Sequence, residues 1–431
     1  MVWPHVPAYR VYVAPAARET SMTSTAAAPH PGMGFKQFVA LIAALMAVNA
    51  LAIDSMLPAL PQIGHAFGVA DPNQNQLILT AYLLGFGVAQ LAYGVLADRY
   101  GRKPVMLAGL AIYVVTCGLC ALATSFEMML VARALTGVGA AATRVLTVSI
   151  VRDSYSGRQM ARVMSLSFIV FLAVPIIAPS LGQAIMLVAP WRWIFGVLAV
   201  FGMAVAVWMW LKLPETLHPE DRRRISISSV LAAFKVVLTD RVAMGYTLAM
   251  TVIIGSLFGF LNSAQQVFTD VFNAGATFPL IFAGIAGGMA LSSLLNAQIV
   301  DRLGMRKVSH SALIGFIVIA VVHAGVALAG FETIWTFAIL QALMMFCFGM
   351  VASNFGAMAM EPLGHVAGMA ASVQGFISTV GGAILGWAIG QQFNGSTVPL
   401  TLGFALLGLG ALLVVLFVEN GRLFRSSTQP A

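Results

Sequence analysis

The chain has 431 residues, of which 60% are apolar and only 9% are charged, and its mean hydropathy is +0.91. Soluble domains carry about 25% charged and about 45–50% apolar residues, so this composition excludes a cytosolic enzyme, a secreted module and a disordered scaffold. The lipid bilayer is the solvent that suits it. The three cysteines, Cys117, Cys120 and Cys347, lie in apolar runs without a further ligand set, and they indicate neither a disulfide framework nor a metal site.

The first 35 residues differ from the rest of the chain. They are rich in Ala, Pro, Ser and Thr and contain no apolar core long enough for a signal peptide. We expect residues 1–35 to form a disordered cytoplasmic tail, or to be an over-extended start, since Met22 and Met33 are alternative initiators.

Twelve apolar runs follow, each close to the roughly 20 residues that a helix needs to cross the hydrocarbon core. The polar breaks between them are short, which is typical of antiparallel neighbours in a bundle, except at residues 214–241. That segment contains the charged run His218-Pro219-Glu220-Asp221-Arg222-Arg223-Arg224 and divides the runs six and six. The runs are Phe38–Leu60, Leu77–Ala97, Val105–Thr124, Glu127–Ile150, Met164–Val188, Trp193–Leu213, Val242–Phe268, Phe278–Ile299, Val308–Ala329, Ile334–Gly356, Val366–Ile389 and Pro399–Val418.

These runs predict an all-α, polytopic membrane protein with twelve transmembrane helices in two six-helix halves. The halves are expected at residues 36–213 and 242–418. We expect residues 214–241 to be a cytoplasmic linker and residues 419–431 to be a cytoplasmic C-terminal tail.

Lysines and arginines predict the orientation of the chain in the membrane. With the N-terminus placed in the cytoplasm, 20 of the 23 basic residues fall in cytoplasmic segments, and only Arg192 falls in an outer loop. This distribution follows the positive-inside rule, and it explains the net charge of +8 without a nucleic-acid partner. Both termini are therefore expected in the cytoplasm.

One loop occurs twice, after the second run and after the eighth. The first copy contains Asp98-Arg99-Tyr100-Gly101 and the second contains Asp301-Arg302-Leu303-Gly304, at an offset of 203 residues. The second run thus maps onto the eighth, and the two halves are predicted to be a parallel structural repeat.

Ionisable side chains inside hydrocarbon cost about 2.5–3.5 kcal/mol each on insertion scales, so few persist without a purpose. Of the 15 acidic residues, 14 fall in loops, tails or interfacial ends of the runs, and Asp54 alone lies within the interior of a run. It lies 18 residues after Lys36, and Arg133 lies 19 residues before Arg152, so both are expected about 27–29 Å from the inner surface. Opposite charges at matched depth relieve each other's desolvation. Asp54 and Arg133 are therefore predicted to be a proton-coupling pair, with a purely structural role as the alternative.

Under the constant offset, Asp54 maps to Leu257 and Arg133 to Thr336, which places the coupling chemistry in the first half. Arg144 follows Arg133 by 11 residues, close to three full helical turns, so the two are expected to share one face. The alternative for Arg144 is a bond to carbonyls or a side chain that extends toward the inner surface. Polar in-span residues are expected to bind substrate, or alternatively to bridge helices: Asn49, Arg144, Gln265, Gln341 and Gln374.

Several motifs resemble those of a known family. The loop Gly94-x-Leu96-Ala97-Asp98-Arg99-x-Gly101-Arg102-Lys103 and the in-span Arg133-x-x-x-Gly137-x-Gly139-Ala140-Ala141 resemble two signatures of the major facilitator superfamily, the second found in its proton-coupled members. The segment at 174–183 is similar to the antiporter motif, although Val174, Ala178 and Gln183 stand where that motif has Gly. With Ile53-Asp54-Ser55-Met56-Leu57-Pro58-Ala59, it resembles the bicyclomycin/chloramphenicol-resistance branch of drug:proton antiporters. The resemblance covers about residues 36–420.

The resemblance implies a secondary transporter of the bacterial inner membrane, not an enzyme, that exports small amphipathic drugs in exchange for protons. The alternative on the same fold is a proton-coupled transporter of a metabolite such as a sugar or an organic anion. A membrane sensor or channel is a third, different class. The expected partners are a small molecule, protons and the lipid bilayer, with no cofactor, no metal and no nucleic acid, and the expected state is a monomer.

The same motifs imply a set of gating residues: Asp98, Arg99, Gly101, Arg102, Asp153, Pro175 and Pro179. Asp98, Arg102 and Asp153 are expected to form a charge cluster at inner helix ends. His323 in the ninth run is interpreted as a satisfied polar contact near the outer interface rather than a proton relay.

Overall fold

The computed structural model describes residues 33–222 and 227–424. Nearly all of the predicted N-terminal tail lies outside the described residues, as do residues 425–431 of the predicted C-terminal tail. Within the described part of the chain, twelve helical segments are long and apolar enough to cross a membrane. This confirms the predicted number of spans.

The first six spans are built from α1 (Phe35–Asp54), α3 (Leu77–Tyr100), α4 (Arg102–Ala121), α5 (Phe126–Ser154), α6 (Gly157–Val188) and α7 (Arg192–Lys212). The second six are built from α9 (Arg241–Gln266), α10 (Phe278–Leu303), α11 (Met305–Leu328), α12 (Ile334–Met360), α13 (Ala367–Gly390) and α14 (Val398–Val418). Shorter elements flank them: η1 (Leu57–Ala59), α2 (Leu60–Ala66), η2 (Pro72–Gln76), η3 (Pro219–Asp221), α8 (Ile227–Thr239), η4 (Val267–Val271) and η5 (Glu361–Val366).

The first span is interrupted in its second half, where the sequence predicted one continuous run. α1 ends at Asp54, and the chain resumes as η1 and α2. Pro58 is the cause, because a proline has no N–H to donate and its ring clashes with the carbonyl four residues earlier, here that of Asp54. The break places the carboxyl group of Asp54 at a helix end.

The break in α1 is covered closely by α6. A Cβ on Gly182 of α6 would lie 1.8 Å from the carbonyl oxygen of Ser55, so glycine is required for this approach of the two backbones. Irregular backbone at membrane depth is tolerated only where protein or a cavity surrounds it, and α6 provides that cover. Pro175 and Pro179 both lie inside α6, which continues as one helix through them.

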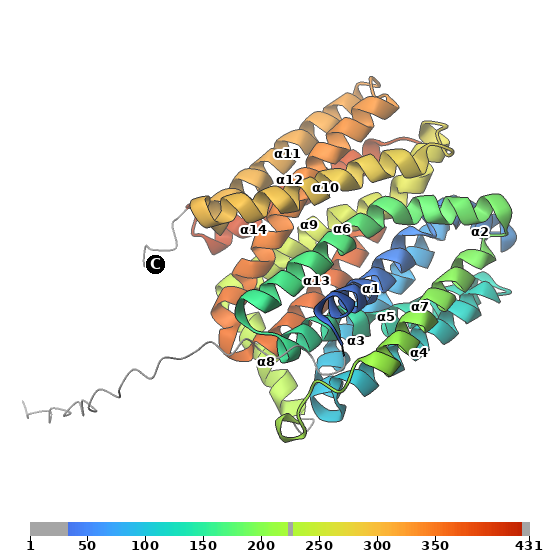
Figure 1. Cartoon of the computed structure of the whole chain (residues 1–431). Helices are drawn as coiled ribbons and strands as arrows, with labels where there is room; N and C mark the ends of the chain where they lie inside the picture. The colour runs from blue at the N-terminus through green and yellow to red at the C-terminus, as the bar shows by residue number, and fades with distance from the viewer. Residues whose placement is uncertain (1–32, 223–226, 425–431) are drawn as a thin grey trace, which may run out of the picture.

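The two halves meet along α3 and α13 and along α6 and α10. Figure 1 shows the first half, blue to green, beside the second half, yellow to red, with α6 and α13 among the helices between them. α8, in the segment that joins the halves, packs on α13, and the rings of Phe234 and Phe376 lie 6.4 Å apart. The linker is therefore held against the second half.

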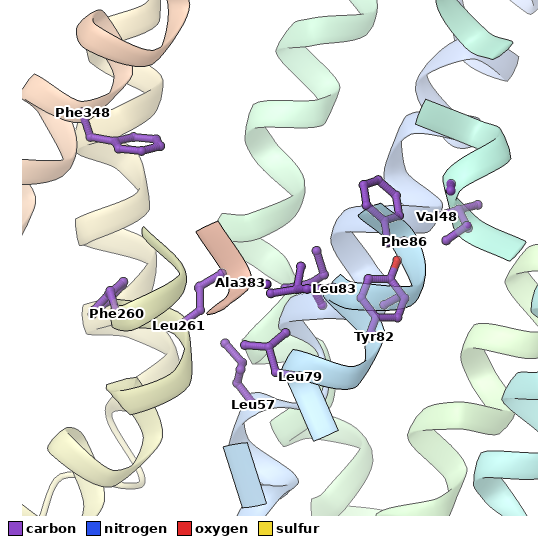
Figure 2. Packing of buried hydrophobic residues seen from close by; sticks show 14 of the residues in the cluster. Val48, Leu57, Leu79, Tyr82, Leu83, Phe86, Phe260, Leu261, Phe348 and Ala383 are labelled. Atoms are coloured by element: carbon purple, nitrogen blue, oxygen red, sulfur yellow. The ribbon is translucent and has the colours of Figure 1, made fainter. Parts of the chain in front are cut away.

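The buried apolar side chains form a core that continues across the boundary between the halves. Figure 2 shows part of it, with Leu57, Leu79 and Leu83 of the first half on the side that faces Leu261 and Ala383 of the second. The core therefore surrounds the space in which the polar groups of the site are found.

Candidate functional site

A cavity of about 200 Å³ lies between the two halves. Residues of α1, α3, α6, α9, α10, α12 and α13 line it, so both halves contribute to its wall. The wall is mostly aromatic and aliphatic, with Asp54, Asn49 and Thr379 as its polar side chains. The lining residues are Asn49, Ala50, Ile53, Asp54, Leu83, Phe86, Leu172, Pro175, Leu257, Phe258, Phe260, Leu261, Phe282, Ile285, Ala286, Met289, Met345 and Thr379.

Asp54 is the acidic residue of this central cavity. Its side chain is 4% exposed, and it forms no hydrogen bond or ion pair with any other described residue. A buried carboxyl group without a donor is costly when ionised. Asp54 is therefore accessible from the cavity, and a bound proton or cation relieves the energetic cost of its charge.

Arg133 of α5 is fully buried near Asp54, but it does not pair with that carboxylate in this conformation. Its guanidinium donates to the carbonyl oxygens of Ala52 (3.1 Å) and Ile78 (3.4 Å) and lies over the ring of Tyr82, 4.5 Å from the centroid. Nη1 has no partner among the described residues. The depth argument placed Arg133 beside α1 correctly, because Ala52 precedes Asp54 by two residues, and the expected direct ion pair is absent.

The structure also corrects the predicted equivalent of Arg133 in the second half. Thr336 is the third residue of α12 and belongs to the capping box with Thr333, whereas Arg133 is deep within α5. Since α5 starts at Phe126 and α12 at Ile334, the offset between these two helices is 208, not 203. Gln341 therefore occupies the equivalent position, fully buried and with both amide atoms unpaired.

A second, smaller cavity adjoins the central one through Asn49, which lines both. Arg144 lies in this smaller cavity and forms no hydrogen bond or ion pair with any described residue. The side chain of Asn49 is held by α3, since Tyr82 donates its hydroxyl to Oδ1 of Asn49 at 2.7 Å. The remaining residues of the small cavity are Met46, Thr143, Thr147 and Val148.

The other three predicted substrate residues do not line the central cavity. Gln265 is buried near the end of α9, and Gln341 is buried within α12. Gln374 of α13 donates to the carbonyl of Gly356 in α12 at 3.4 Å. Gln374 thus follows the alternative interpretation, that of a side chain bridging two helices.

At one end of the bundle, side-chain amides join the two halves. Gln76 donates to Gln266 Oε1 (2.5 Å) and to the carbonyl of Gly390 (3.0 Å), while Gln266 donates to Asn73 Oδ1 (2.7 Å). Gln391 donates to the carbonyl of Asn73 at 2.8 Å. We call these four side chains the amide cluster, and they close this end of the boundary. Sequence reasoning missed them, because they come from three separate segments, η2, the end of α9 and the residue after α13, and no spacing marks them.

At the other end, which we call the basic end, Arg102 pairs with Asp98 (2.5 Å) and with Asp153 (3.1 Å). The predicted charge cluster is confirmed as a set of contacts within the first half, joining α3, α4 and α5. Arg99 is exposed beside it and forms no hydrogen bond or ion pair with a described residue.

Glu215 completes this cluster, and sequence reasoning missed it. Its carboxylate accepts from the backbone N–H groups of Arg102 (2.8 Å) and Lys103 (3.2 Å), so it caps the N-terminus of α4. Gly101 precedes that helix at φ 103°, and a Cβ there would lie 2.4 Å from Glu215 Oε2. Gly101 is therefore required by its backbone conformation and by the cap. A signal for it is present in the sequence, because a glutamate follows the last apolar run of each half: Glu215 after the sixth run and Glu419 after the twelfth.

Glu419 organises the basic end of the second half. It accepts from Tyr246 Oη (2.6 Å) in α9 and from Arg306 Nε (2.8 Å) in α11, and Tyr246 also lies 3.2 Å from His310 Nε2. Burial by itself would raise the pKa of Glu419, but the hydrogen bonds from Tyr246 and Arg306 outweigh it and hold the pKa below its ordinary value of 4.5.

His323 lies at the end of the bundle opposite the basic end, and its contact involves a residue that the sequence did not predict. Nε2 of His323 is 2.6 Å from Oε1 of Glu332, and both side chains are buried. Thr397 donates its hydroxyl to Oε2 of the same glutamate. His323 thus has a polar partner, as interpreted, and the partner is an acid from the loop before α12.

Comparison with known proteins defines the class. The chain resembles secondary transporters built from two six-helix halves around a central cavity, and the family model "Major Facilitator Superfamily" matches residues 42–386. The chain belongs to this superfamily, and it is a transporter rather than an enzyme.

Individual relatives and a solved structure agree with this. The chain is 31% identical to the "Uncharacterized MFS-type transporter YdgK" of Bacillus subtilis (strain 168), over 81% of this chain and 87% of that protein. It is 27% identical to the "Bicyclomycin resistance protein homolog" of Haemophilus influenzae, over 88% and 94%. The xylose transporter XylE from E. coli, in a partially occluded inward open conformation, shares the fold with a TM-score of 0.69 at 11% identity, over 91% and 99% of the two chains.

Proposed function

We propose that this protein exports small amphipathic drugs across the bacterial inner membrane in exchange for protons. The observation that carries the proposal is Asp54, an unpaired buried carboxylate on the wall of a cavity that both halves line. The apolar and aromatic wall suits amphipathic molecules better than sugars, because a sugar needs many hydrogen-bond partners to leave water. The name of the Haemophilus influenzae relative supports the same substrate class.

In the proposed orientation the basic end lies in the cytoplasm, following the distribution of lysine and arginine. The amide cluster then closes the outer end of the boundary between the halves. Rocking of one half against the other would break the amide cluster on the outside while the boundary closes at the basic end. Pro175 and Pro179 of α6, together with Asp98, Arg99, Gly101, Arg102 and Asp153, are the residues proposed to guide this movement.

Coupling is proposed to depend on the partner of Arg133. In this conformation Arg133 bonds to the carbonyl of Ala52 and keeps Nη1 free, an arrangement that suits a protonated, neutral Asp54. Loss of the proton leaves a carboxylate that the free donor of Arg133 can reach after a small movement at the break of α1. A proton and the substrate thus compete for binding at Asp54, and exchange transport requires that competition.

The test is transport by purified protein in liposomes with an imposed pH gradient. An antiporter accumulates a fluorescent drug in the liposome when the lumen is more acidic than the outside, because protons then leave as the drug enters. It releases the drug when the pH gradient is reversed. A metabolite symporter shows the opposite dependence with a sugar or an organic anion. Drug movement that ignores the gradient would contradict proton exchange, and Asp54→Asn protein of equal amount serves as the control.

A further inference from the structure

Arg144 is a cation within the membrane-spanning part of α5 that the proposed coupling does not use. It forms no hydrogen bond or ion pair with any described residue, and an unpaired cation at this depth is costly. Extension to the surface is not an adequate explanation, because Arg152, at the basic end, lies eight residues away along the helix, about 12 Å.

The side chain of Arg144 faces the protein interior rather than lipid. Val131 and Leu135 are 60% and 42% exposed and mark the face of α5 that meets the bilayer. Arg144 follows Val131 by 13 residues, a rotation of about 1300°, which places it about 140° away from that face. Arg144 is nevertheless exposed, and its side chain lines the small cavity together with Asn49 and Thr147.

Asn49 connects this small cavity to the central one. Its Oδ1 accepts from Tyr82, which fixes the amide and leaves its NH₂ group available as a donor. Asn49 and the Arg144 guanidinium thus form a pole of hydrogen-bond donors. Asp54, which is an acceptor only once its proton has left, forms the opposite pole, about 7.5 Å further along α1. Apolar side chains such as Phe86 and Leu83 lie on the wall of the central cavity.

We infer that the site selects molecules with two polar ends. A carboxylate or carbonyl group binds Arg144 and Asn49, and a basic or donor group binds near Asp54, with an apolar body against the wall. The inference rests on the proposed export of amphipathic drugs and narrows it to zwitterionic or donor–acceptor compounds. A guanidinium and a carboxylate form strong, charge-assisted hydrogen bonds, so the carboxylate end contributes much of the selectivity.

The experiment uses one fluoroquinolone scaffold in three charge forms: the zwitterion, its methyl ester, which keeps only the amine, and its N-acyl derivative, which keeps only the carboxylate. Transport of each is measured in liposomes containing the wild-type protein, Arg144→Gln, Arg144→Lys or Asn49→Asp. Arg158→Gln, which removes an exposed arginine at the start of α6, is the matched control.

Arg144→Gln is expected to lower transport of the zwitterion and the N-acyl acid by about tenfold or more, since a hydrogen bond to a charged group is lost. The ester is expected to change by less than about twofold. Arg144→Lys retains the charge and should restore part of the preference.

Asn49→Asp keeps the acceptor for Tyr82 and adds a negative charge beside Arg144. It should therefore lower transport of the two acids selectively, and it tests the inference even if Arg144→Gln does not accumulate in the membrane. An equal loss of all three compounds in both variants, or no loss, would overturn the inference while the proposed export stands. Failure of wild-type protein to move any of the three would instead contradict the proposed function.

Discussion

The two halves repeat one fold but place different chemistry at equivalent depth. In the first half, α5 buries Arg133 beside the break of α1 that carries Asp54. In the second half, the position equivalent to Arg133 is Gln341, and the cavity wall contributed by α9 is apolar at Leu257 and Phe260. In the proposed mechanism, a duplicated scaffold thus needs only one charged half, and the neutral half provides a surface against which the charged half changes its partners.

The largest expected effect tests whether the carboxylate must lie in the first half. Asp54→Asn should abolish drug accumulation driven by a pH gradient, because the group that exchanges its proton is gone, while protein levels in the membrane stay normal. Moving the acid across the cavity, as Asp54→Leu with Leu257→Asp, should not restore it, because Leu257 has no partner like Arg133. Accumulation by the relocated variant at the wild-type rate would show that the two halves are interchangeable.

The next pair of variants compares the two equivalent positions directly. Arg133→Gln gives the first half the residue of the second, and it should reduce gradient-driven transport by about tenfold or more, since hydrogen bonds to two carbonyls and the donor for Asp54 are lost. Gln341→Leu removes an amide that has no partner and should leave both transport and thermal stability unchanged or slightly higher. A large loss of transport in Gln341→Leu alone would instead support its predicted role in substrate binding.

The repeated loops at the basic end allow a third comparison, of smaller effect. Gly101 and Gly304 both have positive φ, 103° and 81°, but only Gly101 has a side chain, that of Glu215, where a Cβ would stand. Ala at either position costs about 1–3 kcal/mol of backbone strain. Gly101→Ala should therefore lower the melting temperature of the detergent-solubilised protein more than Gly304→Ala. Glu215→Ala combined with Gly101→Ala should remove the difference, apart from the loss of the cap.

Sequence reasoning predicted the parts of the molecule that depend on local or periodic signals. The twelve spans follow from apolar length, and the contacts of Arg102 with Asp98 and Asp153 follow from a motif in one short loop. Pro58 indicates the break at Asp54, but apolar length alone predicts a continuous run, because hydropathy does not depend on a missing N–H. The 208-residue offset between α5 and α12 was hidden because the loops between spans differ in length.

Contacts that join distant segments could not be predicted from the sequence, because no local pattern indicates them. Gln76 and Gln266 are 190 residues apart, and each reads as an ordinary polar residue at the end of an apolar run. In the sequence Glu332 is an ordinary acidic residue of a loop, and only the fold brings its carboxylate to His323. Arg133 was placed at the right depth, but depth alone does not decide between a carboxylate and the backbone carbonyls beside it.

The smallest expected effect concerns acid stability at the basic end of the second half. The pKa of Glu419 lies below its ordinary value of 4.5, so its ion pair with Arg306 stabilises the folded protein above about that pH, and this stability is lost as the pH falls through the lower, folded-state pKa. The groups that face Glu419 are Tyr246 of α9 and Arg306 and His310 of α11.

Glu419→Gln should therefore melt a few degrees earlier than wild type at neutral pH, and the difference should shrink in acid. Melting of both proteins between pH 7 and pH 3 measures it. A gap between the two melting temperatures that is the same at every pH would contradict the ion pair as its source.

The chemistry of the amide cluster determines how the closed end of the protein responds to pH. Its bonds join amides and backbone carbonyls, none of which titrates in the physiological range. In the proposed orientation, acid outside the cell therefore does not weaken this closure, and it opens only when the whole half moves. If the proposed proton exchange holds, an empty carrier with such a closure does not leak protons on the outer side merely because the outside is acidic, and many copies in the membrane then cost the cell little when no drug is present.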